Sequence, residues 1–332
     1  MYVYYNIMLR LSIIIPNYNG KEYLKNCVDS LFKQSVRSFE VIIVDDASSD
    51  DAVDELMQEY PANTGLPCVR YLKHAENKGF AASVNDGIAA ARAEYVLLLN
   101  NDTVADPGFV EAMWRDIRRS DSVFSVSAKM LNMHEPSKMD DAGDYFCALG
   151  WAFSDARDKE ATEYNRLREV FSACGGAAIY RRDVLLDLGG FDEAHFAYLE
   201  DVDLGYRAKL KGYRNIYSPE AVVLHAGSGS SGSRYNEFKL RLTVRNQVYL
   251  LYKNMPLWQW IVNFLPLMAG WIIKLVFFAR KGMGGAYIKA FAEGIRLCAA
   301  NKDKRVDHSS VPLSRQLKTE GELIINTIRR IL

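Results

Sequence analysis

Short runs of branched apolar residues alternate with helix-like patterns through the first hundred residues of the chain. The apolar runs are Leu11–Ile15, Phe39–Val44, Tyr95–Leu99 and, more weakly, Val69–Leu72. A strand that is apolar on both faces belongs inside a parallel sheet, because helices there cover both faces. Helical patterns fill the gaps, over 23–34, 52–60 and 81–92. The alternation therefore predicts an α/β fold with a parallel, doubly wound sheet.

Polar residues follow three of these runs, at the strand ends where such sheets bind their ligands. The three segments are Pro16-Asn17-Tyr18-Asn19-Gly20, Asp45-Asp46-Ala47-Ser48-Ser49-Asp50 and Asn100-Asn101-Asp102. Carboxylate and amide oxygens suit Mg²⁺ or Mn²⁺. For the second segment, capping of the next helix by Asp46 and Ser48 is an alternative, and it is compatible with ligand contact.

A second group of acids opens a later helix. Glu200, Asp201 and Asp203 fall in the first turn of a helical pattern that reaches about Lys211, where the helix dipole favours negative charge. The dipole alone would explain them, and Asp203 satisfies it as well as Asp201 does. Together with the acidic strand ends, however, they suit a reaction in which a cation clamps a diphosphate and a carboxylate deprotonates a hydroxyl. No G-x-x-x-x-G-K-[ST] sequence is present, which argues against a P-loop ATPase.

The net charge of zero conceals two unlike parts. Residues 1–237 hold 36 acidic and 25 basic side chains, whereas residues 238–332 hold 5 acidic and 16 basic ones. Such asymmetry predicts an anionic surface as neighbour of the second part. The alternative is a helical extension that simply packs on an acidic domain. We expect two regions, 1–235 and 236–332.

One long apolar segment lies in the basic part. Residues 257–279 are interrupted only at intervals of three or four, which on a helix makes one narrow stripe, by Gln259, Asn263, Pro266, Gly270 and Lys274. We expect a helix lying at the headgroup boundary of a membrane. A bilayer span and an ordinary packed helix are the alternatives. Residues 313–332 predict a further amphipathic helix.

Cysteines, the start of the chain and one glycine motif add smaller expectations. The five cysteines are widely spaced and odd in number, which favours a reduced, cytoplasmic chain. The start has neither a basic region nor a long apolar one, so we expect no signal peptide, and Met8 is an alternative start to Met1. Gly227 to Gly232 match G-x-G-x-x-G, but no acid follows about 20 residues later, so a loop is expected rather than a dinucleotide site.

Several motifs together resemble one enzyme family. They include Ser12-Ile-Ile-Ile-Pro16-Asn17-Tyr18-Asn19, Val44-Asp45-Asp46, Asn77-Lys78-Gly79-Phe80, Asn85-Asp86-Gly87, Leu98-Leu-Asn-Asn-Asp102, Gly189-Gly190-Phe191-Asp192-Glu193 and Glu200-Asp201-Val-Asp-Leu204. Their order over about residues 11–250 resembles family 2 glycosyltransferases of the GT-A type. The resemblance implies a nucleotide-binding, doubly wound mixed sheet, here with a C-terminal helical membrane-associating extension.

The resemblance also implies roles for matching residues. Asp201 matches the catalytic base, and Glu200 its neighbour in the acceptor site, where Gly175 and Gly176 are also expected. Asp46 would accept from the ring N–H of a pyrimidine, and Lys78 would lie near the ribose or diphosphate. The nucleotide-sugar site as a whole would comprise Pro16, Asn17, Tyr18, Asn19, Asp45, Asp46, Lys78, Gly79, Asn100, Asn101 and Asp102.

The metal site departs from the family pattern. Asp102 matches the last position of the D-x-D motif, but the first position is Asn100, so one carboxylate stands where the family has two. His225 matches a histidine that completes the metal or diphosphate site in many relatives, although it could simply close a strand. Fewer anionic ligands predict weaker binding of Mg²⁺ or Mn²⁺.

The motif Asn-Asn-Asp-Thr and the basic, apolar tail look most like rhamnosyltransferase-type members. Such enzymes would move a sugar from a nucleotide-diphosphate donor, here dTDP-rhamnose, to a polyprenyl-linked or glycan acceptor in cell-surface polysaccharide synthesis. The transfer would invert the configuration at the anomeric carbon. The enzyme would then lie in the cytoplasm, peripheral on the inner face of the cell membrane. Alternatives are a UDP-hexose or UDP-N-acetylhexosamine donor, a non-catalytic sugar-nucleotide-binding protein and a nucleotidyltransferase. No nucleic acid partner is expected.

Overall fold

The computed structural model describes residues 9–227 and 236–332. Within these residues ten strands form one mixed sheet, with the path order β10-β12-β6-β11-β4-β1-β2-β3, while β5 pairs with β12 and β7 with β6. A short hairpin, β8–β9, stands apart from it. The strands are β1 Leu11–Asn17, β2 Phe39–Asp45, β3 Cys68–Lys73, β4 Tyr95–Leu99, β5 Thr103–Ala105, β6 Val123–Asn132, β7 Met139–Asp141, β8 Tyr145–Phe146, β9 Ala152–Phe153, β10 Arg168–Val170, β11 Ala177–Arg181 and β12 Arg214–His225.

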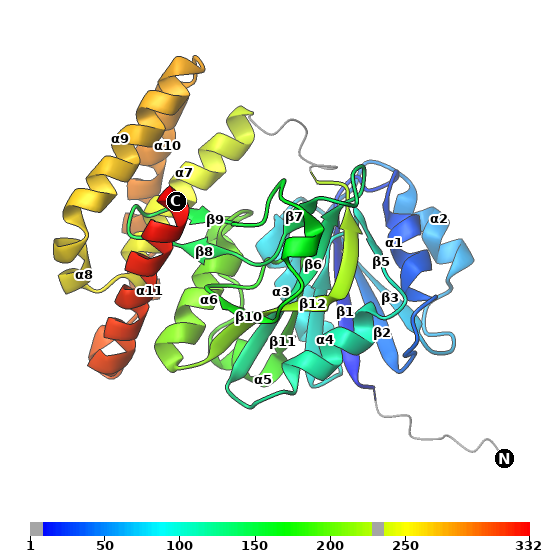
Figure 1. The fold of residues 1–332 in the computed structure, drawn as a ribbon. Helices are drawn as coiled ribbons and strands as arrows, with labels where there is room; N and C mark the ends of the chain where they lie inside the picture. Colours follow the sequence, from blue (N-terminus) through cyan, green and yellow to red (C-terminus); the bar gives the residue numbers. More distant parts are fainter. Residues whose placement is uncertain (1–8, 228–235) are drawn as a thin grey trace.

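The helices divide between the sheet and a separate group near the C-terminus (Figure 1). Those beside the sheet are α1 Leu24–Leu31, α2 Ala52–Glu59, α3 Phe80–Ala90, α4 Phe109–Ile117, α5 Arg182–Asp187 and α6 Glu200–Lys211. The later ones are α7 Glu237–Asn254, α8 Leu257–Val262, α9 Phe264–Arg280, α10 Gly284–Ala300 and α11 Leu313–Ile331.

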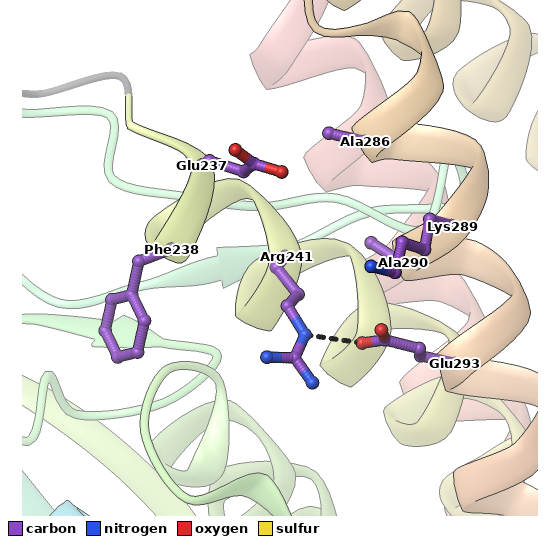
Figure 2. Close-up of a pocket in the computed structure, with 7 residues that line it drawn as sticks. All are labelled: Glu237, Phe238, Arg241, Ala286, Lys289, Ala290 and Glu293. Carbon is purple, nitrogen blue, oxygen red and sulfur yellow. Dashed lines mark hydrogen bonds and ion pairs between the residues drawn. The ribbon is translucent and has the colours of Figure 1, made fainter.

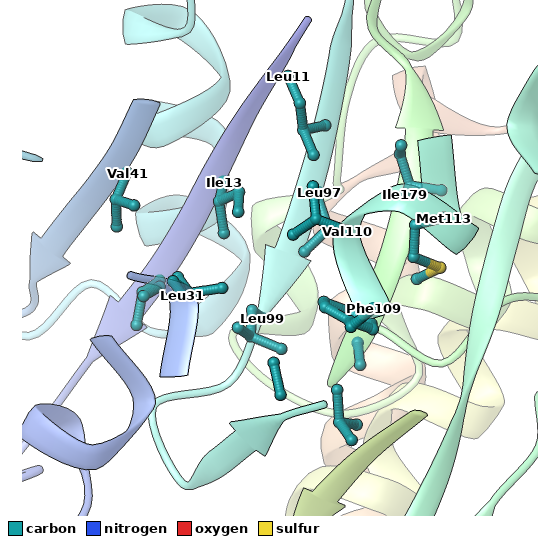
Figure 3. Packing of buried hydrophobic residues seen from close by; sticks show 14 of the residues in the cluster. Leu11, Ile13, Leu31, Val41, Leu97, Leu99, Phe109, Val110, Met113 and Ile179 are labelled. Carbon is teal, nitrogen blue, oxygen red and sulfur yellow. The ribbon is translucent and has the colours of Figure 1, made fainter. Parts of the chain in front are cut away.

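The alternation of side chains along the central strands builds two apolar layers. On β1, Ile13 and Ile15 enter the layer with α1, α2 and α4, whereas Ile14 enters the opposite layer with α3 and α6. Figure 3 shows part of the first layer, where Leu97 and Leu99 of β4 lie near Phe109 and Met113 of α4. Since both faces are covered, the continuous apolar runs of these strands are explained.

The expected α/β fold with a mixed sheet is confirmed. β1 pairs in parallel with β2 and β4, and β2 with β3, as the alternation predicts. β11 then runs antiparallel to both β4 and β6, which makes the sheet mixed. The five cysteines, all in the described part, form no disulfide, as expected.

The long apolar segment differs from the single helix predicted over 257–279. It is divided at Asn263 into α8 and α9, and its interrupting polar residues face the protein rather than the exterior. The Gln259 side chain accepts from Tyr206 Oη at 3.0 Å, and Asn263 Nδ2 donates to Glu320 at 2.9 Å. Gly270 lies so close to the Leu149 carbonyl that a Cβ there would be 2.3 Å from its oxygen. None of the described helices is long and apolar enough to cross a membrane.

The outward face of these helices is apolar. Leu257, Ile261, Phe264 and Leu265 are each more than half exposed, and α11 exposes a similar row. We call this set the apolar outer face; it comprises Leu257, Ile261, Val262, Phe264, Leu265, Met268, Ile272, Ile273, Val276 and Phe277 of α8–α9, and Leu313, Leu317, Ile324, Ile325, Ile328 and Ile331 of α11. The helices that carry it stand together on one side of the molecule (Figure 1).

Three sequence expectations lie outside the described residues or are not decided by the structure. The glycine-rich loop expected over 227–232 lies outside them except for Gly227, and so does the start of the chain before Leu9. The boundary expected at 235/236 stays a prediction.

Candidate active site

The carboxyl ends of β1, β2 and β4 meet at one edge of the sheet, and side-chain hydrogen bonds join them. Asn17 at the end of β1 pairs with Asp45 at the end of β2, and its Nδ2 donates to Asp45 Oδ1 at 3.1 Å. Asn101, which follows β4, donates from Nδ2 to Asn17 Oδ1 at 2.8 Å. These buried amides therefore hold three strand ends in fixed register, as the position of a ligand site requires.

A cleft of about 1030 Å³ opens beyond these strand ends. Most of the predicted site residues line it, namely Pro16, Asn17, Tyr18, Asp46, Gly79, Asn100, Asn101, Asp102, Gly175, Gly176, Glu200, Asp201 and His225. Three predicted residues are not among those lining it. Asn19 and Asp45 bond within the adjoining loops, and the Lys78 ammonium lies 3.4 Å from Asp86. Their roles toward a nucleotide stay predictions.

Asp46 is buried and binds three donors of the chain. Its Oδ1 accepts from the backbone N–H of Lys78 at 2.8 Å, and its Oδ2 from that of Gly79 at 2.8 Å. His74 Nδ1 lies 2.8 Å from the same Oδ1. A carboxylate has about four acceptor positions, so room is left for one further donor such as a ring N–H.

Gly79 is required by this arrangement. Its φ is +88°, and a Cβ there would lie 2.5 Å from the ring of Phe196. Glycine alone adopts this backbone without strain. The motif Asn77-Lys78-Gly79 thus presents two N–H groups to Asp46.

The metal candidates Asp102 and His225 are brought together by strand pairing. His225 ends β12 opposite Thr103 of β5, and His225 Nε2 lies 3.2 Å from Asp102 Oδ1. His225 Nδ1 lies 2.7 Å from Asp140 Oδ2. Burial would lower the pKa of His225, but the carboxylates of Asp102 and Asp140 outweigh it and raise the pKa to about 10.

A divalent cation held by these two side chains would replace the proton that lies between His225 Nε2 and Asp102 Oδ1. Two ligands bound at about 2.1 Å and at right angles lie about 3 Å apart, close to the observed separation of Oδ1 and Nε2. Both side chains are nearly buried and line the cleft. The carboxylate oxygen is a ligand that Mg²⁺ and Mn²⁺ prefer, whereas imidazole is more typical of Zn²⁺, Cu²⁺, iron and Ni²⁺ sites.

The predicted base lies at the start of α6, where the backbone is strained. Phe196, Tyr198 and Leu199 all have positive φ, between +64° and +71°. Such strain persists only where the surroundings impose it, and it concentrates at functional sites. Asp201 Oδ2 accepts from the Gly175 N–H at 2.8 Å, and the neighbouring Gly176 carbonyl accepts from Asn100 N–H at 2.8 Å. The predicted acceptor glycines therefore link the base to the β4 end.

Burial makes the carboxyls at this end of the cleft weak acids. It raises the pKa of Asp201, against the lowering effect of backbone N–H donors at Gly175 and Val202. Burial and the charge of Asp201 raise the pKa of Glu200 well above its usual value. Glu200 Oε2 has no hydrogen-bond partner among the described residues. A raised pKa improves a carboxylate as a proton acceptor.

The sequence analysis missed several cleft residues in the irregular segment 130–170 and beyond it. Asp144 has an oxygen within 4.8 Å of ligand atoms of both Cys174 and Asp201, and burial with neighbouring carboxylates raises the pKa of Asp144 well above normal. Arg157 and Lys239 bring positive charge to the same cleft. Further missed lining residues are Asp140, Asp141, Asp158, Phe196, Tyr198 and Thr243. For Asp140, Asp141 and Asp144 the sequence signal is the density of acids over 139–144.

A second group of buried acids is structural. Lys253 of α7 places its Nζ 2.7 Å from Asp192 Oδ2 and 2.9 Å from Asp203 Oδ2. Asp203 also binds Arg207 and Asn254. Because protein cations already occupy this cluster, Asp203 serves to join α6 to α7.

A smaller pocket of about 320 Å³ lies between α7 and α10 (Figure 2). Arg241 and Glu293 form an ion pair of 2.6 Å across it. Phe238 lines both this pocket and the large cleft, so the two adjoin.

Known proteins resemble the chain in sequence and in fold. It is 28% identical over 248 residues to the N-acetylglucosaminyl-diphospho-decaprenol L-rhamnosyltransferase of Mycobacterium tuberculosis, covering 67% of this chain and 78% of that one. The fold is shared with the mannosyltransferase PcManGT of Pyrobaculum calidifontis in complex with GDP-Man and Mn²⁺ (TM-score 0.56, 18% identity, 98% of this chain and 83% of the other). It is also shared with Staphylococcus aureus TarS 1-349 in complex with UDP-GlcNAc (TM-score 0.54, 18% identity, 96% and 85%).

The family model for glycosyl transferase family 2 matches residues 12–189, more than half of the chain. The expected family and enzyme class are thereby confirmed. The chain belongs to glycosyl transferase family 2 and is a glycosyltransferase.

Proposed function

We propose that the protein transfers a sugar from a nucleoside diphosphate to a hydroxyl acceptor with inversion at the anomeric carbon. The observation that carries the proposal is the single cleft that joins Asp46 and Asp102 at the strand ends to Asp201 at the start of α6. A donor at the strand ends and an acceptor near Asp201 would meet within it.

In this proposal Asp201 acts as the general base. Its carboxylate takes the proton of the acceptor hydroxyl while that oxygen bonds to the anomeric carbon and the bond to the diphosphate breaks. The Gly175 N–H, 2.8 Å from Asp201 Oδ2, holds the carboxylate in place. Arg157 and Lys239 supply positive charge to the cleft in which the diphosphate departs.

Asp102 and His225 would hold Mg²⁺ or Mn²⁺. When bound, such a cation stabilises the charge that develops on the leaving diphosphate. The nucleotide would lie against Pro16, Asn17, Tyr18 and Asp46, with Asp46 accepting from its base.

The proposed donor is dTDP-rhamnose and the proposed acceptor a sugar on a polyprenyl diphosphate. The support is the 28% identity to a rhamnosyltransferase whose name gives such an acceptor. UDP-hexose or UDP-N-acetylhexosamine donors are the alternative, supported by the shared fold with a UDP-GlcNAc complex.

Thermal unfolding with a panel of nucleotide sugars, with and without Mn²⁺, tests the donor. A ligand at 100 times its Kd adds about 2.7 kcal/mol to stability, so the true donor should raise the melting temperature most. NMR of the product then gives the anomeric configuration. Retention of configuration would contradict the proposed mechanism, and a larger shift with a UDP-sugar would contradict the proposed donor.

We also propose that the apolar outer face lies on the inner surface of the cell membrane, where a lipid-linked acceptor would be found. Its exposed Leu, Ile and Phe side chains are unusual for a water-facing surface. Exposed basic side chains lie at the ends of the same helices, Arg280 in the last turn of α9 and Arg329 and Arg330 in the last turn of α11. Apolar area with positive charge suits an anionic lipid surface.

A further inference from the structure

His225 has two different neighbours, one on each ring nitrogen. Nε2 faces Asp102 Oδ1 at 3.2 Å, within the cleft. Nδ1 faces Asp140 Oδ2 at 2.7 Å, a short distance typical of a strong hydrogen bond. A ring held at Nδ1 by an acceptor can turn only Nε2 toward a ligand.

Asp140 is itself held in place from the other side. Arg157 Nη2 lies 3.3 Å from Asp140 Oδ1, and Arg157 Nε donates to the Asp140 carbonyl at 3.3 Å. Asp140 belongs to β7, which pairs with β6, while His225 pairs with Asn132 of β6. The two residues are therefore held by the strands on the two sides of β6 in one sheet.

We propose that Asp140 is the positioning residue of the cation site, holding the His225 ring so that Nε2 and Asp102 Oδ1 bind one divalent ion. Metal-bound histidines commonly donate their second ring N–H to a carboxylate, which fixes the ring and makes it a better ligand. The inference rests on the proposed function, because that function places the ion at Asp102 and His225.

In this role Asp140 would compensate for the carboxylate that the metal motif lacks. Asn100 stands where a second acid is expected, so Asp102 supplies the one carboxylate of Asn100-Asn101-Asp102. A carboxylate behind His225 adds negative charge close to the ion without occupying a coordination position. Asp140, 85 residues before His225, is not visible as part of the site in the sequence.

Titration of the full-length protein with Mn²⁺, followed by electron paramagnetic resonance of the free ion, tests the proposal without measuring catalysis. Asp140→Ala should weaken Mn²⁺ binding about 10- to 100-fold, as loss of such a partner typically does. Asp140→Asn keeps an acceptor oxygen and loses the charge, so its affinity should fall between those of Asp140→Ala and the wild type. Asp121→Ala removes an exposed acid that contacts only the Arg181 side chain, at 3.5 Å, among the described residues, and should bind as the wild type does.

Wild-type affinity in both Asp140 variants, with an unchanged melting temperature, would overturn the positioning role. Failure of the wild type to bind Mn²⁺, or unchanged binding in Asp102→Asn, would instead overturn the cation site of the proposed function and this inference with it. If Asp140→Ala does not fold, Asp140→Asn carries the test alone.

Discussion

Two buried side chains, Asp201 and His195, have shifted pKa values that should make activity and stability depend on pH. Asp201 sits at the start of α6 with its pKa raised by burial, and His195 lies fully buried nearby with its pKa lowered to about 4 by burial. The first shift bears on catalysis because the base must be ionised. The second bears on stability because a buried imidazole resists protonation.

As the pH is lowered, we expect the transfer rate to start falling at a higher pH than it would with an aspartate of ordinary pKa. The raised pKa of Asp201 means that protonation begins above the usual 3.8 and removes the base. The measurement is kcat against pH at saturating donor and acceptor. A rate that stays constant down to pH 4 would contradict the role of Asp201.

His195 should make the fold sensitive to mild acid. Its pKa is 6.5 in the unfolded chain and about 4 when folded, so its contribution to stability is complete above 6.5 and is lost as pH falls toward 4. The loss is at most about 3 kcal/mol, at 1.36 kcal/mol per pKa unit. Urea unfolding at pH 7.5 and 4.5 measures it, and His195→Phe should show a smaller difference between the two pH values. An equal difference in the variant would contradict this assignment.

Among the elements, α7 joins the basic part of the chain to α6 through a buried group of ion pairs. Lys253 lies between Asp192 and Asp203, all three nearly buried. Removing one partner of a buried ion pair costs about 3–5 kcal/mol, because a charge is left without compensation. Lys304 and Arg207 still pair with the two acids, which places the cost at the lower end.

Lys253→Met should therefore lower the free energy of unfolding by about 3 kcal/mol. Lys304→Met is the matched control, since that side chain is 40% exposed and its ion pair should contribute less than about 1 kcal/mol. Chemical denaturation gives both values. Equal effects of the two substitutions would contradict the view that Lys253 is the central cation.

Elements with an uninterrupted apolar pattern could be predicted from the sequence, and others could not. β1, β2 and β4 are buried on both faces, so their runs identify them. β6 could not be predicted because buried Ser125 and Ser127 interrupt its apolar residues, and the partner of Ser125 is Asn215, 90 residues away. In α8–α9 the periodicity was correctly detected, but the polar stripe faces inward because Gln316 and Glu320 of α11 bind it. Which face a stripe presents depends on partners that sequence spacing does not reveal.

The same limit applies to the site. Strand-end residues such as Asn17 and Asp102 could be predicted because topology brings strand ends together. Asp140, Asp144 and Arg157 come from a segment of short strands and turns whose path is set by tertiary contacts, so the local density of acids does not show that they reach the cleft. The sequence also could not show that Asp46 is already bound by backbone N–H groups.

Over the whole molecule, charge and apolar surface are segregated. The acidic part holds the cleft, and the basic part carries the apolar outer face on helices at one side (Figure 1).

We expect the double substitution Ile261→Gln with Leu265→Gln to weaken binding to anionic vesicles, measured by sedimentation, about 10- to 100-fold. The reason is that each side chain buried in the lipid surface contributes about 1.5 kcal/mol. Leu186→Gln, an exposed leucine of α5, is the control. Unchanged vesicle binding would contradict the proposed surface, and loss of a dimer instead would assign the face to a second copy.

The central claim is that Asp201 is the base of a glycosyl transfer, and the most direct measurement is the turnover of Asp201→Asn. The variant should keep its fold and bind the donor as the wild type does, because the proposed donor site lies at the strand ends and not at Asp201. The account predicts a loss of about 10²- to 10⁴-fold in kcat for transfer to the acceptor. Near-complete turnover in the folded variant would contradict it.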